Sequence, residues 1–343
     1  MKISRVGVDL AKNIFQLHGA DIHGKAVWKR KLSRERWIEA VCKTVPQGCE
    51  IGMEACGSAH YWARLLTDLG YEVKLISPQF VKPFVKSNKN DANDAEAISE
   101  AMSRPNMRFV KVKSVEQQDI QAIHRVRSEL VSQRTAKVNQ IRGLAAEYGL
   151  VTSQKVSSLR EVLPRWLEDA ENCLTARFRT LLKGLWDDLI HLDGRIAKLD
   201  CEIQDIAKHD PLARRLQQLR GVGPLVSTAL IATVGNGDQF TKGRQMAASI
   251  GLTPRQFSSG GKDRLLGISK RGDAYLRTIL IHGARATIAH AKNRDDPLSL
   301  WIADLGKRRH ANVVAVALAN KTVRMAWAMM QSNSDYDPEM AAA

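Results

Sequence analysis

The chain has 343 residues, of which 44% are hydrophobic and 26% charged, so it is long enough to bury more than one core. This composition excludes collagen-like, mucin-like and disulfide-framework proteins. Lysine and arginine number 52 against 36 acidic residues, and the net charge of +16 favours a polyanionic partner, with nucleic acid first. The alternative is a basic, well-solvated surface that binds no polyanion.

The five cysteines are odd in number and lack Cys-x-x-Cys spacing, so they support neither a disulfide framework nor a zinc knuckle. This cysteine usage fits a reducing cytoplasm. No stretch reaches the roughly eighteen uncharged apolar residues that a membrane span needs. Asp9 and Lys12 also interrupt the N-terminal stretch where a signal peptide needs an apolar run. We therefore expect a cytoplasmic, nucleoid-associated protein with no membrane partner.

Residues 1–113 alternate short β-rich stretches with helical ones. The pattern predicts helices at Arg34–Lys43 and His60–Leu69, and strands at Arg5–Leu10, Ile14–Ala20, Ala26–Leu32, Glu50–Ala55 and Glu72–Ile76. Three early strands with tight connections, followed by alternating helix and strand, indicate a mixed α/β sheet that resembles the ribonuclease-H topology. A dinucleotide-binding fold is not favoured, because no Gly-x-Gly-x-x-Gly follows the first strand.

Residues 114–210 are expected to be helical, with a coiled-coil region. One apolar stripe has spacings that alternate between four and three residues: Phe178, Leu182, Leu185, Leu189, Leu192, Ile196, Leu199, Ile203, Ile206. Pairing within the chain and pairing between subunits would bury it equally well. We favour assembly between subunits, because the preceding helix, Val115–Leu144, keeps the pattern poorly. Residues 211–331 are predicted to be mostly helical, and 332–343 to form a disordered tail.

Acidic residues close two apolar strands and open a helix. Asp9 ends one strand and Glu54 another, while Asp91 and Asp94 lie three residues apart on one helical face. Four hard oxygen donors around one cleft suit Mg²⁺ or Mn²⁺, and two such ions serve phosphodiester chemistry. The alternative reading makes Asp91 and Asp94 helix caps and pairs Glu54 with a lysine. The expense of unpaired carboxylates at apolar strand ends favours the metal site.

Two further segments are candidates for nucleic-acid contact. Gly221 and Gly223 form a Gly-x-Gly turn before a small-residue helix, which resembles a helix-hairpin-helix phosphate grip; the alternative is a tight turn between packed helices. A Ser-Gly stretch within 241–280 carries eight cations against two carboxylates. It can hold a phosphodiester and offer it a serine hydroxyl, or it can be a solvated loop. Its candidate phosphate contacts are Arg255, Lys262, Arg264, Lys270, Arg271 and Arg277.

Together these segments resemble a known family. The ordered motifs GVDLAKN, GMEACG, KNDANDAEAI, LRGVGPLVSTALIATVG and GLTPRQFSSGGKDRLLGISKRGDAYLRTIL resemble the DEDD transposases of the bacterial insertion-sequence family numbered one-hundred-ten, over nearly the whole chain. The resemblance implies a RuvC-like N-terminal domain, a coiled-coil middle and a mostly helical C-terminal transposase domain. It also implies that Asp9, Glu54, Asp91 and Asp94 match the metal-binding tetrad, and that Ser259, next to Gly260, matches the nucleophile. Ser258 leaves the choice within the doublet open.

The resemblance further implies RNA-guided recombination. A non-coding guide RNA from the element would pair with donor and target DNA, so specificity would lie in base pairing. The protein would be a tetramer built from dimers, whose active site joins the tetrad of one subunit to the serine of another. Ser259 would attack a phosphate and form a phosphoserine link. Five cations after Ser114 could hold RNA or DNA, with a solvated helical face as the equal alternative: Arg125, Arg127, Arg134, Lys137 and Arg142.

Two other function classes stay open on the sequence. In a junction-resolving nuclease, water would attack in place of Ser259, so that Ser259→Ala would still cut while Asp9→Ala would not. In a non-catalytic binding protein neither change would alter anything except affinity. A tyrosine recombinase is disfavoured, because Tyr275 and Tyr336 have no surrounding Arg-His-Arg arrangement in the sequence.

Overall fold

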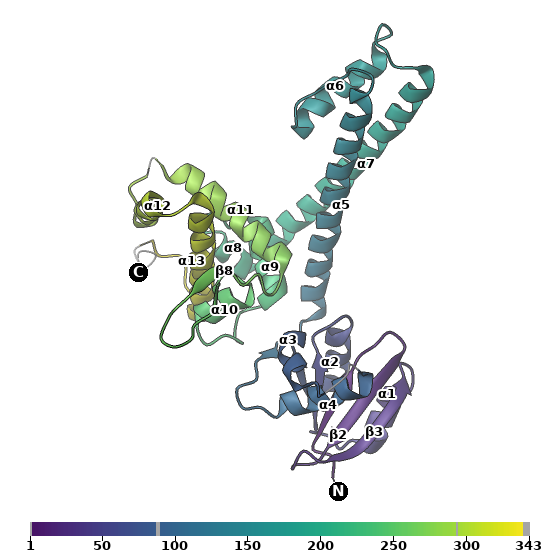
Figure 1. The fold of residues 1–343 in the computed structure, drawn as a ribbon, viewed down its shortest axis with the longest axis vertical. Coiled ribbons are helices and arrows are strands. Elements are labelled where there is room, and N and C mark those ends of the chain that lie inside the picture. Colours follow the sequence, from purple (N-terminus) through teal and green to yellow (C-terminus); the bar gives the residue numbers. More distant parts are fainter. Residues whose placement is uncertain (1, 87–89, 293, 339–343) are drawn as a thin grey trace. The chain divides into compact units, whose positions relative to one another are not determined.

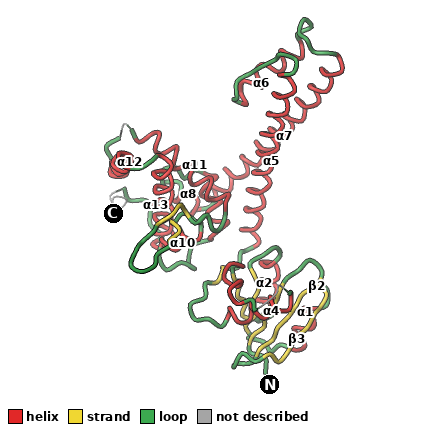
Figure 2. Tube along the Cα trace, viewed as in Figure 1, coloured by secondary structure: helices red, strands yellow, loops and turns green. Residues whose placement is uncertain are grey.

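A computed structural model describes residues 2–86, 90–292 and 294–338, and it divides the chain into two compact units (Figure 1). The first unit, Met1–Ser114, contains the six-stranded sheet, and the second, Val115–Ala343, is dominated by helices (Figure 2).

The first unit is built on a mixed sheet with the strand order β3-β2-β1-β4-β5-β6. Strand β1 pairs antiparallel with β2 and parallel with β4; β5 is parallel to β4, and β6 is antiparallel to β5. The strands are β1 (Arg5–Asp9), β2 (Ile14–Ala20), β3 (Ala26–Ser33), β4 (Glu50–Glu54), β5 (Glu72–Ile76) and β6 (Phe109–Val110). The five predicted strands are therefore confirmed to within one residue, and β6 was not predicted.

Helices cover both faces of this sheet. On one face, Val6, Val8, Ile51 and Met53 pack with α1 (Trp37–Thr44) and α2 (Ala59–Asp68). On the other face lies α4 (Asp91–Met102), preceded by α3 (Pro78–Val81) and a short 3₁₀ turn, Lys82–Phe84. Helix α4 lies so close to β1 that a Cβ on Gly7 would be 2.2 Å from the carbonyl oxygen of Ala95. Glycine at position 7 thus sets the distance between sheet and helix.

The second unit begins with a long antiparallel pair of helices. Helix α5 (Val115–Ala146) lies along α7 (Ala176–His209), and α6 (Val156–Glu168) packs near the turn that joins them (Figure 1). The predicted apolar stripe of α7 is buried within this pair at Phe178, Leu182, Leu189, Leu192, Ile196 and Ile203. Pairing within the chain therefore covers the stripe, and the expectation that it serves assembly between subunits loses its basis.

A helical bundle completes the second unit. Its core joins α9 (Pro224–Val234), α11 (Ala274–Ala291) and α13 (Ala311–Ser332), with α8 (Pro211–Leu216), α10 (Gly243–Ser249) and α12 (Pro297–Arg308) around them. Helix α9 contacts both α5 and α7. A short hairpin of β7 (Pro254–Gln256) and β8 (Leu265–Ile268) interrupts the helices. This hairpin lies within the stretch that the sequence indicated only as rich in serine and glycine.

Helix α13 is also the one described helix long and apolar enough to cross a membrane by length and composition. Half of its most apolar stretch is buried, as in the core helix of a bundle. The first part of the predicted disordered tail contacts the bundle, contrary to the expectation. Gln218 binds Asp335 through its Nε2 at 2.9 Å and accepts the N–H of Tyr336 at 2.7 Å, and Tyr336 packs on the core. Residues 339–343 of that prediction lie outside the described residues.

Candidate active site

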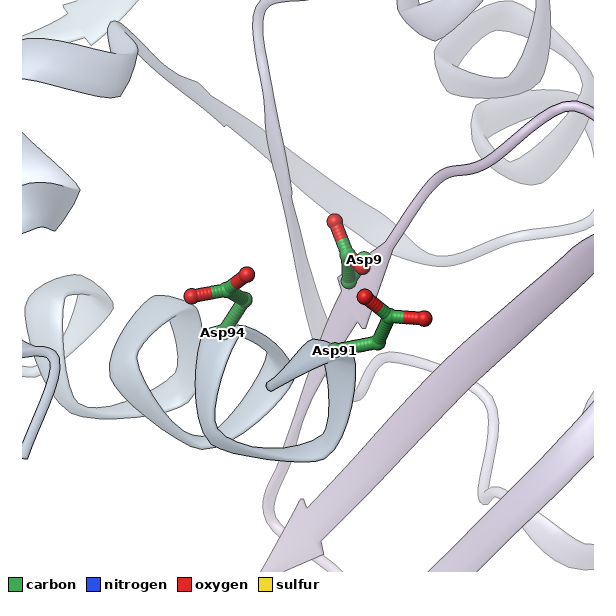
Figure 3. A group of neighbouring side chains, drawn as sticks. All are labelled: Asp9, Asp91 and Asp94. Atoms are coloured by element: carbon green, nitrogen blue, oxygen red, sulfur yellow. The ribbon is translucent and has the colours of Figure 1, made fainter. Parts of the chain in front are cut away.

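Three of the four predicted acidic ligands converge at one end of the sheet. Asp9 is the last residue of β1, and Asp91 and Asp94 lie in the first turn of α4. Oxygen atoms of the three carboxylates all lie within 4.8 Å of one another (Figure 3). Asn90 fixes the start of the helix, because its side-chain oxygen accepts the N–H of Ala92 at 3.0 Å. A cap is thus provided by Asn90, which leaves the two aspartates to face Asp9.

Glu54, the fourth predicted ligand, ends β4 on the neighbouring parallel strand, but it is not part of the close group of three. The register pairs Val8 with Met53, so Asp9 and Glu54 occupy equivalent places at the same sheet edge. Cys56 lies near both: burial, reinforced by the negative charges of Glu54 and Asp9, raises the pKa of its thiol. The edge is therefore acidic beyond the three converging aspartates.

The donor set fits a hard divalent cation. Three half-buried or exposed carboxylates at this separation repel one another, and a cation bound between them offsets that repulsion. Carboxylate oxygens without thiolate or imidazole neighbours in the group suit Mg²⁺ or Mn²⁺. The geometry brings together Asp9, Asp91 and Asp94, with Glu54 beside them as a further oxygen donor.

The Ser258-Ser259 doublet lies between β7 and β8, where both residues are exposed. The hydroxyl of Ser258 donates to Asp263 Oδ1 at 2.8 Å and accepts from Gln256 Nε2 at 2.8 Å. Gln256 Nε2 also donates to Asp263 at 3.1 Å. These side-chain hydrogen bonds link the two strands of the hairpin near its turn, and they occupy the hydroxyl of Ser258. Ser259 is bonded through its backbone, because its carbonyl accepts the N–H of Lys262 at 3.1 Å.

The candidate phosphate contacts around the hairpin differ in their exposure and in their hydrogen bonds within the chain. Arg277 has one nitrogen engaged within the chain, because its Nη1 donates to the carbonyls of Ile250 at 3.0 Å and Arg271 at 2.8 Å. It links the base of the hairpin to the bundle through this atom, and its role as a phosphate contact stays a prediction. The other five candidates are exposed: Arg255, Lys262, Arg264, Lys270 and Arg271.

The Gly-x-Gly turn has a packing role in the structure. Gly221 has a φ of +79°, and a Cβ there would lie 2.6 Å from the carbonyl oxygen of Gly283 in α11. Glycine is thus required at position 221, where the turn contacts α11. This contact agrees with the alternative interpretation of the motif as a tight turn between packed helices. Gly223 is different, because it is exposed at the start of α9 with open space around its Cα. The role of Gly221 and Gly223 as phosphate contacts stays a prediction.

Most of the cations proposed on α5 are paired within the chain. Arg127 pairs with Asp200, Arg134 with Asp193 at 3.5 Å, and Lys137 with Asp188 at 2.9 Å, all across to α7. These three residues therefore link the two helices, and their prediction as nucleic-acid contacts is not supported. Arg125 is exposed and Arg142 is half-buried.

A buried polar cluster joins the long helices to the bundle, and sequence reasoning missed it. His124 of α5 is 2% exposed; its Nε2 lies 2.9 Å from Thr228 Oγ1 and its Nδ1 3.0 Å from Tyr275 Oη. Thr228 donates its own proton to the carbonyl of Pro224, so His124 donates through Nε2 and accepts from Tyr275. The Tyr275 hydroxyl is therefore engaged in packing, which agrees with the disfavoured reading as a tyrosine recombinase.

Comparison with known proteins agrees with these features. A model of the IS110-type DEDD transposase matches residues 6–149, and one described as "Transposase IS116/IS110/IS902 family" matches residues 213–298. A "Probable family 20 transposase" of Pseudomonas aeruginosa is 50% identical over 98% of this chain and 100% of its own length. The "Transposase for insertion sequence element IS1111A" of Coxiella burnetii is 46% identical, over 97% and 91%. The chain therefore belongs to the IS116/IS110/IS902 family of insertion-sequence transposases, enzymes that act on DNA.

Proposed function

We propose that this transposase exchanges DNA strands at specific sites through a covalent phosphoserine intermediate. The observation that carries the proposal is the convergence of Asp9, Asp91 and Asp94 within 4.8 Å, inside the segment that matches the DEDD transposase model. Three carboxylates gathered at a sheet edge fit a phosphodiester-processing centre better than a set of unrelated surface charges.

In this proposal Asp9, Asp91 and Asp94, with Glu54, hold Mg²⁺ or Mn²⁺. The bound cation would polarise the phosphoryl oxygen and stabilise the leaving oxygen. The carboxylates fix the cation at the end of β1, and close packing of α4 on Gly7 holds two of them in place. The chain's own contribution here is the position and charge of its acids.

Ser259 is the proposed nucleophile. A bond forms between its Oγ and the scissile phosphorus, the phosphorus bond to the deoxyribose oxygen breaks, and the proton lost by the serine hydroxyl passes to that leaving oxygen. The hydroxyl of the incoming strand then displaces the serine, which regains its proton, so the ester conserves the energy of the original bond. Use of the Ser258 hydroxyl in the Asp263 brace supports Ser259 as the free member of the doublet. Phosphate charge would be neutralised by Arg255, Lys262, Arg264, Lys270 and Arg271.

Family membership supports the rest of the proposal. We take the sheet unit to be RuvC-like, in agreement with its strand order, and the partners to be donor DNA, target DNA and an element-encoded guide RNA. We also propose a homo-oligomer, a tetramer built from dimers, in which the acids of one subunit act with Ser259 of another. Such a protein would work in the bacterial cytoplasm, at the nucleoid.

The test uses the purified protein, the flanking RNA of its element, labelled junction DNA and Mg²⁺, resolved on a denaturing gel. A protein-linked DNA band that is lost in Ser259→Ala and in Asp9→Ala, but kept in Ser258→Ala, is the expected result. Free cleaved ends that persist in Ser259→Ala would make the protein a hydrolytic nuclease and contradict the serine mechanism.

A further inference from the structure

The β7–β8 hairpin exposes large apolar side chains that the chain itself does not cover. Phe257 is 69% exposed and Leu265 is 65% exposed. A two-stranded hairpin is marginally stable alone, and leaving such residues in water brings no stability. Exposure alone does not identify an occupant, so the face on which each side chain lies decides which of them an external strand can contact.

The register separates the hairpin side chains into two faces. Gln256 pairs with Leu265, the N–H of Phe257 donates to the carbonyl of Arg264 at 2.9 Å, and Ser259 pairs with Lys262. Because side chains alternate along a strand, these pairs place two sets on opposite faces. One face carries Arg255, Phe257, Ser259, Lys262 and Arg264, and the other carries Gln256, Ser258, Asp263 and Leu265.

The hydrogen bonds agree with this division. Gln256, Ser258 and Asp263 all bind one another, as residues of one face should. The only acidic residue of the hairpin thus lies on the face opposite Ser259. The serine face combines one exposed aromatic ring with three cations and has no carboxylate among them.

That combination selects a nucleic-acid strand as occupant. A protein surface would cover the ring but would need a separate carboxylate for each of the three cations. A single nucleic-acid strand supplies both phosphates for the cations and flat bases for the ring. Aromatic rings flanked by arginine or lysine are the usual platform for unpaired bases, because every base has a face that stacks.

We propose that Phe257 is a stacking platform for an unpaired DNA base next to the phosphate that Ser259 attacks, with Arg255 and Arg264 holding the flanking phosphates. The proposal rests on the function proposed above, since Ser259 defines which phosphate is meant. Phe257 and Ser259 are two residues apart on one face, about 7 Å along the strand, so a base adjacent to the bound phosphate reaches the ring. Stacking would hold the exchanging strand open and in register with the serine.

The experiment measures binding of a short single-stranded oligothymidylate that carries one iodouracil, using the full chain in a Ser259→Ala background. Phe257→Ala is expected to weaken binding about ten- to a hundredfold, and Phe257→Trp to retain it. Irradiation is expected to cross-link the iodouracil to the peptide containing position 257, as mapped by mass spectrometry. Leu265→Ala is the matched control, because it removes an equally exposed apolar side chain from the opposite face, and it is expected to change affinity less than about twofold.

Equal affinity of Phe257→Ala and Leu265→Ala, with a cross-link mapped elsewhere, would overturn the proposal. A change in the sedimentation of the DNA-free protein caused by Phe257→Ala would also overturn it, because the occupant would then be a second copy of the chain. The comparison of binding by Phe257→Ala and Leu265→Ala is made in the Ser259→Ala background, so it does not depend on the serine hydroxyl. Its failure is therefore distinguishable from loss of the phosphoserine mechanism, which the denaturing gel reports separately.

Discussion

Gly7 of β1 and Gly52 of β4 are register partners on adjacent parallel strands, and both face α4. A Cβ on Gly52 would lie 2.0 Å from the sulfur of Met102, at the opposite end of α4 from the aspartates. Because neither residue has a side chain, α4 packs directly against the backbone of β1 and β4 at these two positions. The position of Asp91 and Asp94 beside Asp9 therefore depends on two residues that have no side chain.

Gly7→Ala is expected to displace α4, because the new methyl group meets backbone atoms that have no rotamer to adjust. We expect unfolding free energy to fall by about 1–3 kcal/mol and affinity for Mg²⁺ to fall by about tenfold or more. Urea unfolding and calorimetric titration with Mg²⁺ measure the two effects. Gly194→Ala is the control, since its exposed site on α7 has open space and the change should stabilise the helix. Unchanged Mg²⁺ affinity in Gly7→Ala would contradict the role of this contact.

The two glycines of the Gly-x-Gly turn are expected to respond differently to alanine. Gly221→Ala combines a positive φ with a clash against α11, so it should destabilise the second unit by about 1–3 kcal/mol. Gly223→Ala has room and an extended backbone, so it should leave stability nearly unchanged. Denaturant unfolding of both variants measures this. Similar losses in the two would show that the turn is not set by its contact with Gly283.

Substitutions of Leu182 and its neighbour Leu181 test whether the apolar stripe of α7 packs within the chain or between subunits. Leu182 is fully buried and Leu181 is 59% exposed, so Leu182→Ala should cost about 2–5 kcal/mol and Leu181→Ala little. Because the stripe pairs within the chain, neither change is expected to alter the oligomeric state on sedimentation. Dissociation of an oligomer by Leu182→Ala alone would instead return the stripe to an interface between subunits.

His124 predicts a pH dependence of the second unit. Burial, with a smaller effect of the Arg127 charge, lowers the pKa of His124 to about 4 from 6.5. Between these values the unfolded chain binds a proton that the folded chain does not, so stability rises with pH and is lost as pH falls from 6.5 toward 4, by up to roughly 3 kcal/mol. Thermal unfolding across this window measures the loss.

The control for this pH effect is His124→Gln, which keeps a donor and an acceptor but cannot titrate. It is expected to flatten that part of the profile. His60 of the first unit, whose pKa burial also lowers to about 4, is present in both proteins and provides a common background. An NMR titration in which His124 becomes protonated near pH 6.5 would contradict this interpretation.

The sequence predicted elements whose signal is local. Strands β1 and β4 have short apolar runs bounded by charged residues, and the acids Asp9 and Glu54 are their last residues. The approach of Asp91 and Asp94 to Asp9 could be expected from their spacing on one helical face and from the preference of Mg²⁺ for several carboxylates. Its cause could not, because it depends on contacts between Gly7 and residues of α4 that are distant in sequence.

Other features lack a local signal. Strands β7 and β8 have three and four residues, too short for a recognisable alternation among serine and glycine. The pairing of α5 with α7 was obscured because α5 supplies part of its contact through ion pairs, such as that of Lys137 with Asp188. The cluster of His124, Thr228 and Tyr275 joins three helices, and no spacing within one segment reveals it.

The paired helices α5 and α7 also have a mechanical consequence. Helix α9 of the bundle contacts both, and α7 alone has 34 residues, a length of about 50 Å. Any rotation of the pair about its contact with α9 would therefore be amplified along this length. A rotation of about 5° would move the far tip by about 4 Å over a helix of this length. The buried bonds of His124 lie at the near end, where stiffness has the greatest effect on how far that tip travels.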